Sequence, residues 1–134
     1  MDVYTAVDLS GGAGESIIVS GYFNQDGEFI LHKMNNVKAK TEADESAFIN
    51  MHIAINLFDF PEAPIHIFVS DGLGFESEHV KEYTKQYENN ITIHKVKSTE
   101  YSFRMYVEEG HDPEDRVEYA CRFLEYFAIK YVSI

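Results

Sequence analysis

Three acidic residues stand where a folded chain could gather them. Asp8 and Asp71 each follow an apolar, β-branched segment, and Glu45 lies at the start of a helical pattern of apolar residues. If the two segments form adjacent parallel strands, both aspartates lie at one edge of a sheet, where the helix would add Glu45. Carboxylates gathered in this way repel one another unless a divalent cation neutralises them. Mg²⁺ or Mn²⁺ is therefore the expected cofactor, and two such ions about 3.5–4 Å apart would suit phosphodiester hydrolysis.

The elements that would position these acids begin with three strands. Residues 3–7, 16–23 and 28–34 are rich in β-branched and aromatic residues, which is typical of strands. Asp26 and Gly27 predict a tight hairpin turn between the second and third segments, because Asp-Gly supplies the positive φ that such a turn needs. The three strands are therefore expected to form an antiparallel meander.

Helical periodicity follows the third strand. The predicted apolar stripe of the first helix comprises Phe48, Met51, His52, Ile55 and Phe58. Thr41 or Asp44 would cap this helix, and the proline-containing segment 60–64 would end it. Segments 65–70 and 91–96 predict two more strands, of which the first is apolar enough to be covered on both faces.

The remaining segments predict further helices. Residues 76–87 predict a polar amphipathic helix, whereas residues 98–109 fit either a strand or a helical turn. A last helix is expected to open at Asp112 and Pro113, since Asp caps a helix and proline fits its first position. Its apolar stripe comprises Val117, Ala120, Cys121, Leu124, Phe127, Ala128 and Tyr131. Residues 1–134 are thus expected to form one α/β domain, with a mixed five-stranded sheet covered by helices on both faces.

Composition limits the function classes. The net charge is −12, with 23 acidic and 11 basic residues, which disfavours holding a phosphate backbone. The single cysteine, Cys121, excludes an internal disulfide and suits a reducing compartment. Neither a signal peptide nor an apolar stretch near the length of a membrane helix is visible, so a cytoplasmic protein without membrane contact is expected.

The order of elements and the placement of Asp8, Glu45 and Asp71 resemble the ribonuclease H-like superfamily, most nearly the type 1 ribonuclease H domain. The resemblance implies that these three acids are metal ligands, and that a fourth acid opens the last helix after a loop histidine. The segment GHDPEDRVEYAC looks similar, with His111 as that histidine. Glu118 would be the fourth acid, and Asp115 competes for the role. The segment VDLSGGAGESIIV also looks like the first strands of resolvase and viral packaging nucleases.

Two functions follow from this resemblance. The first is a metal-dependent nuclease acting on RNA, DNA or an RNA–DNA hybrid, which would leave a 5′-phosphate and a 3′-hydroxyl, with His111 assisting product release. The alternative is a catalytically inactive binding module whose acidic surface engages a basic protein partner. The charge of −12 and the missing basic handle helix favour the module, whereas the positions of the acids favour the enzyme. The apolar tail, residues 126–134, leaves a homodimer contact open.

Overall fold

The computed structural model describes residues 1–8, 16–37, 41–70, 90–97 and 113–132. The strands are β1 (Val3–Asp8), β2 (Ser16–Phe23), β3 (Phe29–Val37), β4 (Ile65–Ser70) and β5 (Ile91–Val96), and the helices are α1 (Glu42–Asp59) and α4 (Pro113–Val132). All five predicted strands are present, and the third continues to Val37, beyond its predicted end. The predicted helix at 76–87, the ambiguous segment 98–109 and the predicted cap Asp112 lie outside the described residues.

The five strands form one mixed sheet in the order β3-β2-β1-β4-β5. β1 pairs antiparallel with β2, and β2 with β3, which confirms the predicted meander. β4 then pairs parallel with β1 on one side and with β5 on the other. β1 and β4 are therefore neighbours near the middle of the sheet, as the strand-end site requires.

Two glycines shape the β2–β3 hairpin. Gly27 has a φ of 80°, and the side-chain oxygen of Asn24 accepts from the backbone N–H groups of Asp26 and Glu28, which fixes the predicted turn. At the Ser20/Gly21 step the register of β2 against β3 shifts. A Cβ atom at Gly21 would lie 2.6 Å from the carbonyl oxygen of Ile30, so this close approach of two backbones needs glycine.

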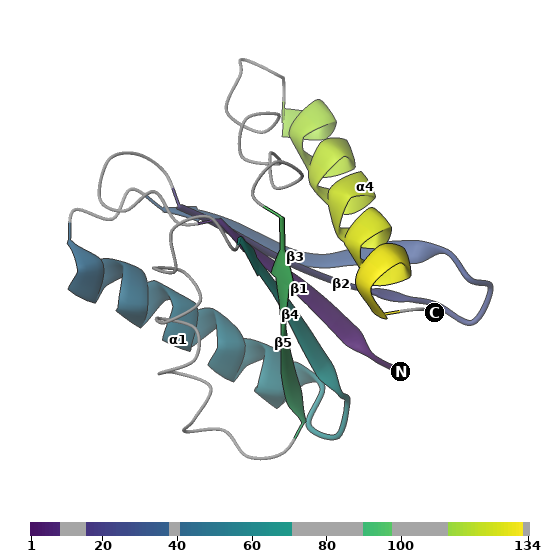
Figure 1. The fold of residues 1–134 in the computed structure, drawn as a ribbon, viewed down its shortest axis with the longest axis horizontal. Helices are drawn as coiled ribbons and strands as arrows, with labels where there is room; N and C mark the ends of the chain where they lie inside the picture. The colour runs from purple at the N-terminus through teal and green to yellow at the C-terminus, as the bar shows by residue number, and fades with distance from the viewer. Residues whose placement is uncertain (9–15, 38–40, 71–89, 98–112, 133–134) are drawn as a thin grey trace.

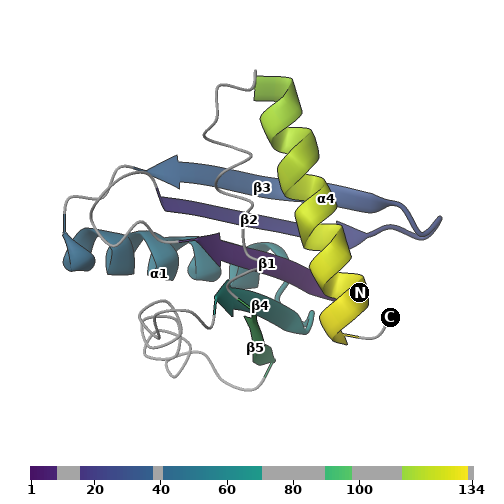
Figure 2. The ribbon, with the colours of Figure 1, turned by 45° about the horizontal axis from the view of Figure 1, so that its top comes forward.

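α1 and α4 cover opposite faces of the sheet (Figures 1 and 2). The face under α1 buries Val3, Val7, Ile18, Phe48, Ile53, Ile65, Ile67 and Val69. The face under α4 buries Tyr4, Ala6, Ile17, Val19, Phe68, Val96, Ala120, Leu124, Phe127 and Ala128. Alternate residues of β1 and β2 thus contribute to both layers, because successive strand side chains point to opposite faces. This confirms the predicted architecture.

The predicted buried stripe of α1 is partly wrong. Phe48 and His52 are buried, but Met51 is 53% exposed and Phe58 is 86% exposed. The stripe that packs on the sheet includes Ile53 and the polar Asn56, along with His52. Apolar residues occur on both sides of this helix, so a search for apolar periodicity cannot tell the packed side from the exposed side.

The ends of the helices follow ordinary capping rules. Thr41, one of the two proposed caps of α1, is the N-cap, because its side-chain oxygen accepts from the backbone N–H of Asp44 at 3.2 Å. α4 packs through Ala120, Leu124 and other members of its predicted stripe, and it begins at Pro113 as expected. Among the described helices, none is long and apolar enough to cross a membrane.

Candidate functional site

The two central parallel strands end next to each other. β1 and β4 pair in register from Val3 with Ile65 to Ala6 with Phe68. Asp8, two residues beyond Ala6, therefore ends β1 level with the end of β4. In both ribbon views these two carboxyl ends lie on the same side of the molecule as the beginning of α1 (Figures 1 and 2). The carboxyl ends of β1 and β4 and the beginning of α1 thus lie on one side of the fold, as the predicted site requires.

Some of the candidate ligands lie within the described residues and others do not. Asp8 is the last residue of β1, and Glu45 lies in the first turn of α1. Asp71 follows directly after the last residue of β4 in the sequence and lies outside the described residues, as does His111. Of the three acids predicted to gather at the strand ends and the helix start, the structure therefore gives the backbone positions of Asp8 and Glu45.

The candidate fourth acid has a partner of its own. Glu118 lies in the second turn of α4, where its side chain is exposed and forms an ion pair with Arg122 one turn later. Asp115, the competing residue, lies in the first turn of the same helix. Because α4 and α1 cover opposite faces of the sheet, the helix that carries Glu118 and the helix that carries Glu45 lie on opposite sides of it. Glu118 would have to exchange its guanidinium partner for a metal ion.

The donor set fits a hard divalent cation. Mg²⁺ and Mn²⁺ prefer carboxylate oxygens, the groups that Asp8, Glu45 and Asp71 carry. Among the side chains that the structure describes, no group of three or more His, Cys, Asp or Glu residues could hold a metal ion. The strand-end acids are outside that described set, and they remain the candidate metal centre.

A buried polar network beneath α1 ties this helix to the sheet. His52 Nε2 lies 2.7 Å from Ser20 Oγ on β2, and His52 Nδ1 lies 3.0 Å from Asn35 Nδ2 on β3. Ser20 Oγ is also 2.8 Å from Thr5 Oγ1 on β1. Asn56, one turn after His52, reaches Ser20 Oγ at 2.8 Å and Thr5 Oγ1 at 3.3 Å. The network therefore connects α1 to all three strands of the meander.

The direction of each hydrogen bond follows from its donors. The Asn35 amide nitrogen can only donate, so His52 Nδ1 accepts and His52 Nε2–H donates to Ser20 Oγ. Ser20 Oγ also accepts a hydrogen bond from the Asn56 amide. The Ser20 hydroxyl in turn donates a hydrogen bond to Thr5 Oγ1. This pattern requires a neutral imidazole. Asn56 Oδ1 is the one described buried side-chain oxygen or nitrogen without a hydrogen-bond partner.

Burial keeps that imidazole neutral. His52 is fully buried, and its pKa falls from 6.5 to about 3, first through desolvation and then through the positive charges of Lys33 and His32. A proton on Nδ1 would also face the Asn35 amide, which is itself a donor. The network therefore depends on the uncharged form of His52.

The network joins the strand that carries Asp8 to the helix that carries Glu45. Thr5 is three residues before Asp8 on β1, and His52 is two helical turns after Glu45 on α1. Holding Thr5, Ser20 and His52 together therefore fixes the strand that carries one acid relative to the helix that carries the other. Apolar patterning does not reveal this cluster. Polar residues inside apolar strands, such as Thr5 and Ser20, were the available signal.

A second chain of polar groups lies toward the opposite ends of β1 and β4. His66 Nε2 is 2.8 Å from an Asp2 carboxylate oxygen, and His66 Nδ1 is 2.9 Å from His94 Nε2 on β5. Tyr4 stacks on His66 with ring centroids 5.1 Å apart. Burial, and then the neighbouring His66, lower the pKa of His94. This chain lies away from the strand-end site and contributes none of its candidate ligands.

Comparisons with known proteins identify the fold. Neither a protein-family model nor a curated protein matches the chain. Two solved structures of RuvC from Thermus thermophilus are similar, each with a TM-score of 0.53 and 11% sequence identity. One of them, in complex with a Holliday junction substrate, matches over 93% of this chain and 81% of the RuvC chain. The other matches over 92% and 80%. RuvC has the ribonuclease H-like fold, and this chain has the same fold.

Proposed function

We propose that this chain is a divalent-metal-dependent nuclease that hydrolyses phosphodiester bonds. The observation that carries the proposal is the in-register parallel pairing of β1 with β4. This pairing places Asp8 level with the last residue of β4, which immediately precedes Asp71 in the sequence. Acids at the ends of adjacent parallel strands, with Glu45 at a nearby helix start, suit a hard-cation site. The likeness to RuvC, whose bound substrate is a Holliday junction, supports a nucleic acid as the substrate class.

The proposed roles divide between binding metal and holding the ligands in place. Asp8, Glu45 and Asp71 would hold Mg²⁺ or Mn²⁺, with Glu118, or Asp115 in its place, as the fourth acid. When bound there, the ions would supply an activated water and stabilise the leaving oxygen. The hydrogen bonds of His52 to β2 and β3, and of Asn56 to β1 and β2, would keep α1 at a fixed position on the sheet, so that the acids of β1 and α1 stay preorganised. His111 is proposed to assist product release.

The proposed substrate is RNA or an RNA–DNA hybrid, and the likeness to RuvC adds a four-way DNA junction to the substrates that require testing. All three carry the same phosphodiester group, which the metal centre would attack. What differs is shape, which the protein would have to recognise with few basic residues, because it has only 11 lysines and arginines. Binding is therefore expected to weaken less steeply with salt than for a basic nuclease.

The experiment is a cleavage assay with end-labelled RNA–DNA hybrid, single-stranded RNA, duplex DNA and a four-way DNA junction. We expect cleavage of at least one substrate with Mg²⁺ or Mn²⁺, complete loss with EDTA, and products that carry a 5′-phosphate and a 3′-hydroxyl. Cleavage that continues in EDTA would contradict the metal requirement. Failure to cleave any substrate at enzyme excess would contradict the nuclease and favour the inactive binding module.

A further inference from the structure

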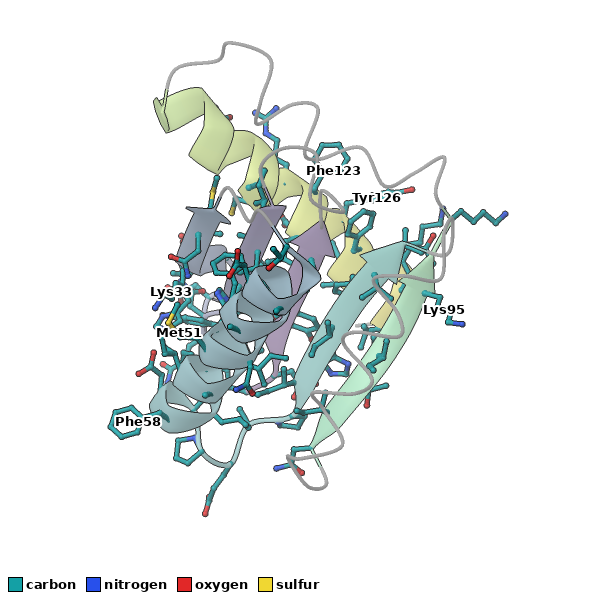
Figure 3. All side chains as sticks on the ribbon, turned by 90° about the vertical axis from the view of Figure 1, so that its left-hand side faces the viewer. Lys33, Met51, Phe58, Lys95, Phe123 and Tyr126 are labelled. Atoms are coloured by element: carbon teal, nitrogen blue, oxygen red, sulfur yellow. The ribbon has the colours of Figure 1, made fainter. Side chains whose placement is uncertain are left out.

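The solvent side of α1 carries a regular apolar stripe. Its members are Ala47, Met51, Ala54 and Phe58, which we call the outer stripe. They are spaced by four, three and four residues, the spacing by which one helix packs against another. Met51 is 53% exposed and Phe58 is 86% exposed. Figure 3 shows both side chains projecting from the same side of α1. The stripe thus has the pattern of a buried helix contact but lies at the surface.

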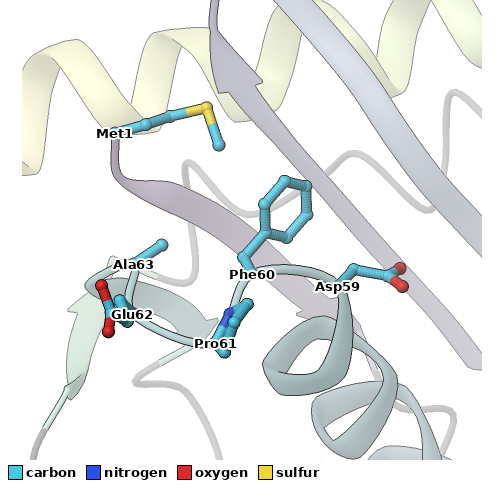
Figure 4. A pocket seen from close by; sticks show the side chains of 6 residues that line it. All are labelled: Met1, Asp59, Phe60, Pro61, Glu62 and Ala63. Atoms are coloured by element: carbon cyan, nitrogen blue, oxygen red, sulfur yellow. The ribbon is translucent and has the colours of Figure 1, made fainter.

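A pocket adjoins the end of the outer stripe. The pocket has a volume of about 540 Å³, and Asp59, the residue after Phe58, forms part of its wall. Its lining residues are Met1, Asp59, Phe60, Pro61, Glu62 and Ala63. In Figure 4 the Met1 side chain extends toward the Phe60 ring, and Asp59 and Glu62 lie on opposite sides of the pocket. Apolar walls with carboxylates at the rim suit a lysine or arginine, whose aliphatic stem can pack while its charged end meets an acid.

The charges around the outer stripe have one sign at both ends. α1 contains no lysine or arginine, and the exposed Asp44 lies near its beginning. Asp59 and Glu62 lie at its other end, where Asp59 contacts the imidazole of His32 at 2.8 Å. In the view of Figure 3, Lys33 of β3 projects from the same side of the molecule as Met51. A partner that covers the stripe would therefore meet acids at both ends.

A second copy of this chain fits this pattern poorly. An antiparallel copy that places Phe58 against Ala47 of its partner would also bring Asp44 next to the other copy's acidic pocket. A parallel copy would place Asp44 against Asp44. Like charges oppose each other in both arrangements, which disfavours association. A helix with basic ends meets opposite charges instead.

We propose that the outer stripe and the adjoining pocket dock an amphipathic helix of a basic partner protein. The apolar residues of that helix would cover Met51 and Phe58, and a lysine or arginine at one end would enter the pocket between Asp59 and Glu62. The helix-in-groove mode uses this spacing of anchors. The proposal does not depend on the nuclease activity, because the stripe lies on the solvent side of α1 and contains none of the candidate metal ligands.

The test uses the whole protein and two synthetic helical peptides of the length of α1. Both peptides carry the same leucine and alanine seam; one has lysines at its ends and the other has glutamates. Fluorescence anisotropy should show the lysine peptide binding at least about tenfold more tightly, with an affinity that falls as salt rises. Phe58→Gln and Met51→Gln should each weaken it about tenfold or more. Ile129→Gln on α4 is the matched control, because Ile129 is also 53% exposed, and it should bind like wild type.

Three results would overturn the proposal. The first is equal binding of the lysine and glutamate peptides, or of neither at millimolar concentration. The second is equal weakening by Phe58→Gln and Ile129→Gln, which would place the contact elsewhere. The third is self-association in sedimentation that Phe58→Gln abolishes and the lysine peptide does not compete with, which would make a second copy the occupant. Cleavage assays on the same variants separate this proposal from the nuclease, because Phe58→Gln should retain any cleavage activity.

Discussion

Replacement of His52 by leucine is expected to lower the free energy of unfolding by about 2–4 kcal/mol at neutral pH. The imidazole is fully buried and makes hydrogen bonds to Ser20 and Asn35. Leucine has a similar volume but offers neither a donor nor an acceptor, so those polar groups lose a partner inside the protein. Urea unfolding followed by circular dichroism would measure the loss.

His32→Leu provides the comparison for that experiment. His32 bonds Asp59 at the surface, where both side chains are partly exposed to water. Exposed ion pairs contribute little, so this change should cost less than about 1 kcal/mol. Equal losses from the two substitutions would show that the buried network contributes no special stability.

The same variant predicts a pH dependence with a definite sign. The pKa of His52 is lowered to about 3 in the folded chain, against 6.5 when the imidazole is unperturbed. The unfolded chain therefore binds a proton below pH 6.5 that the folded chain refuses, and stability falls as pH falls toward 3. His52→Leu has no imidazole at this position, so only wild type loses stability in this way. The difference in free energy of unfolding between wild type and His52→Leu should therefore shrink by on the order of 1 kcal/mol per pH unit below pH 6.5. A constant difference down to pH 4 would contradict a neutral, buried His52.

Asp8→Asn is expected to reduce metal-dependent cleavage by at least about 100-fold. The substitution keeps the size of the side chain at the end of β1 but removes the carboxylate charge that a divalent ion needs. Single-turnover cleavage of the best substrate, at saturating Mn²⁺, would measure it. Because asparagine has nearly the same size and shape as aspartate, the unfolding midpoint should stay close to that of wild type.

Glu125→Gln is the matched control for Asp8→Asn. It also removes one negative charge, but from α4 at a position with no proposed part in the site. Its cleavage rate should remain within about twofold of wild type, since surface charges at a distance are screened. Comparable losses in both variants would point to net charge rather than to a metal ligand.

Local patterns predict most of the strand arrangement in this chain. Each strand is a short segment in which apolar residues alternate with polar ones or follow one another, and Asp26–Gly27 marks the hairpin turn. The sequence therefore predicts β1 to β5 individually. A helix between β3 and β4 favours a crossover that makes β4 parallel to β3 and therefore to β1, but this pattern does not select β1 as the neighbour of β4. The end of β3 was missed because Asn35 and Asn36 do not resemble strand residues, although Asn35 belongs to the buried network.

The orientation of α1 could not be predicted from apolar spacing. The side that packs on the sheet contains His52 and Asn56, whose polar groups are satisfied only by Thr5 and Ser20 on other strands. Helical spacing places His52 on the packed side, but such partners are long-range, so no local signal marks Asn56 as buried or identifies the hydrogen bonds of either residue. Met51 and Phe58 have the apolar character of core residues, so helical spacing alone does not show that they are exposed.

The candidate site could be predicted in outline but not in its ligands. The position of Asp8 level with the residue before Asp71 follows from the strand order, in which β1 and β4 are neighbours. The fourth acid does not, because the first turns of α4 are rich in acids that any helix start favours. Glu118 illustrates the difficulty, since its described partner is Arg122 in an ordinary surface ion pair.

Calorimetric titration of Mn²⁺ into wild type, Asp8→Asn and Asp71→Asn, with and without a non-cleavable nucleic acid, tests the metal centre most directly. We predict millimolar or tighter binding by wild type, strengthened by nucleic acid because substrate phosphates can add ligands, and its loss in both variants. Absence of binding even with nucleic acid present would contradict the metal centre, as would binding that both variants retain.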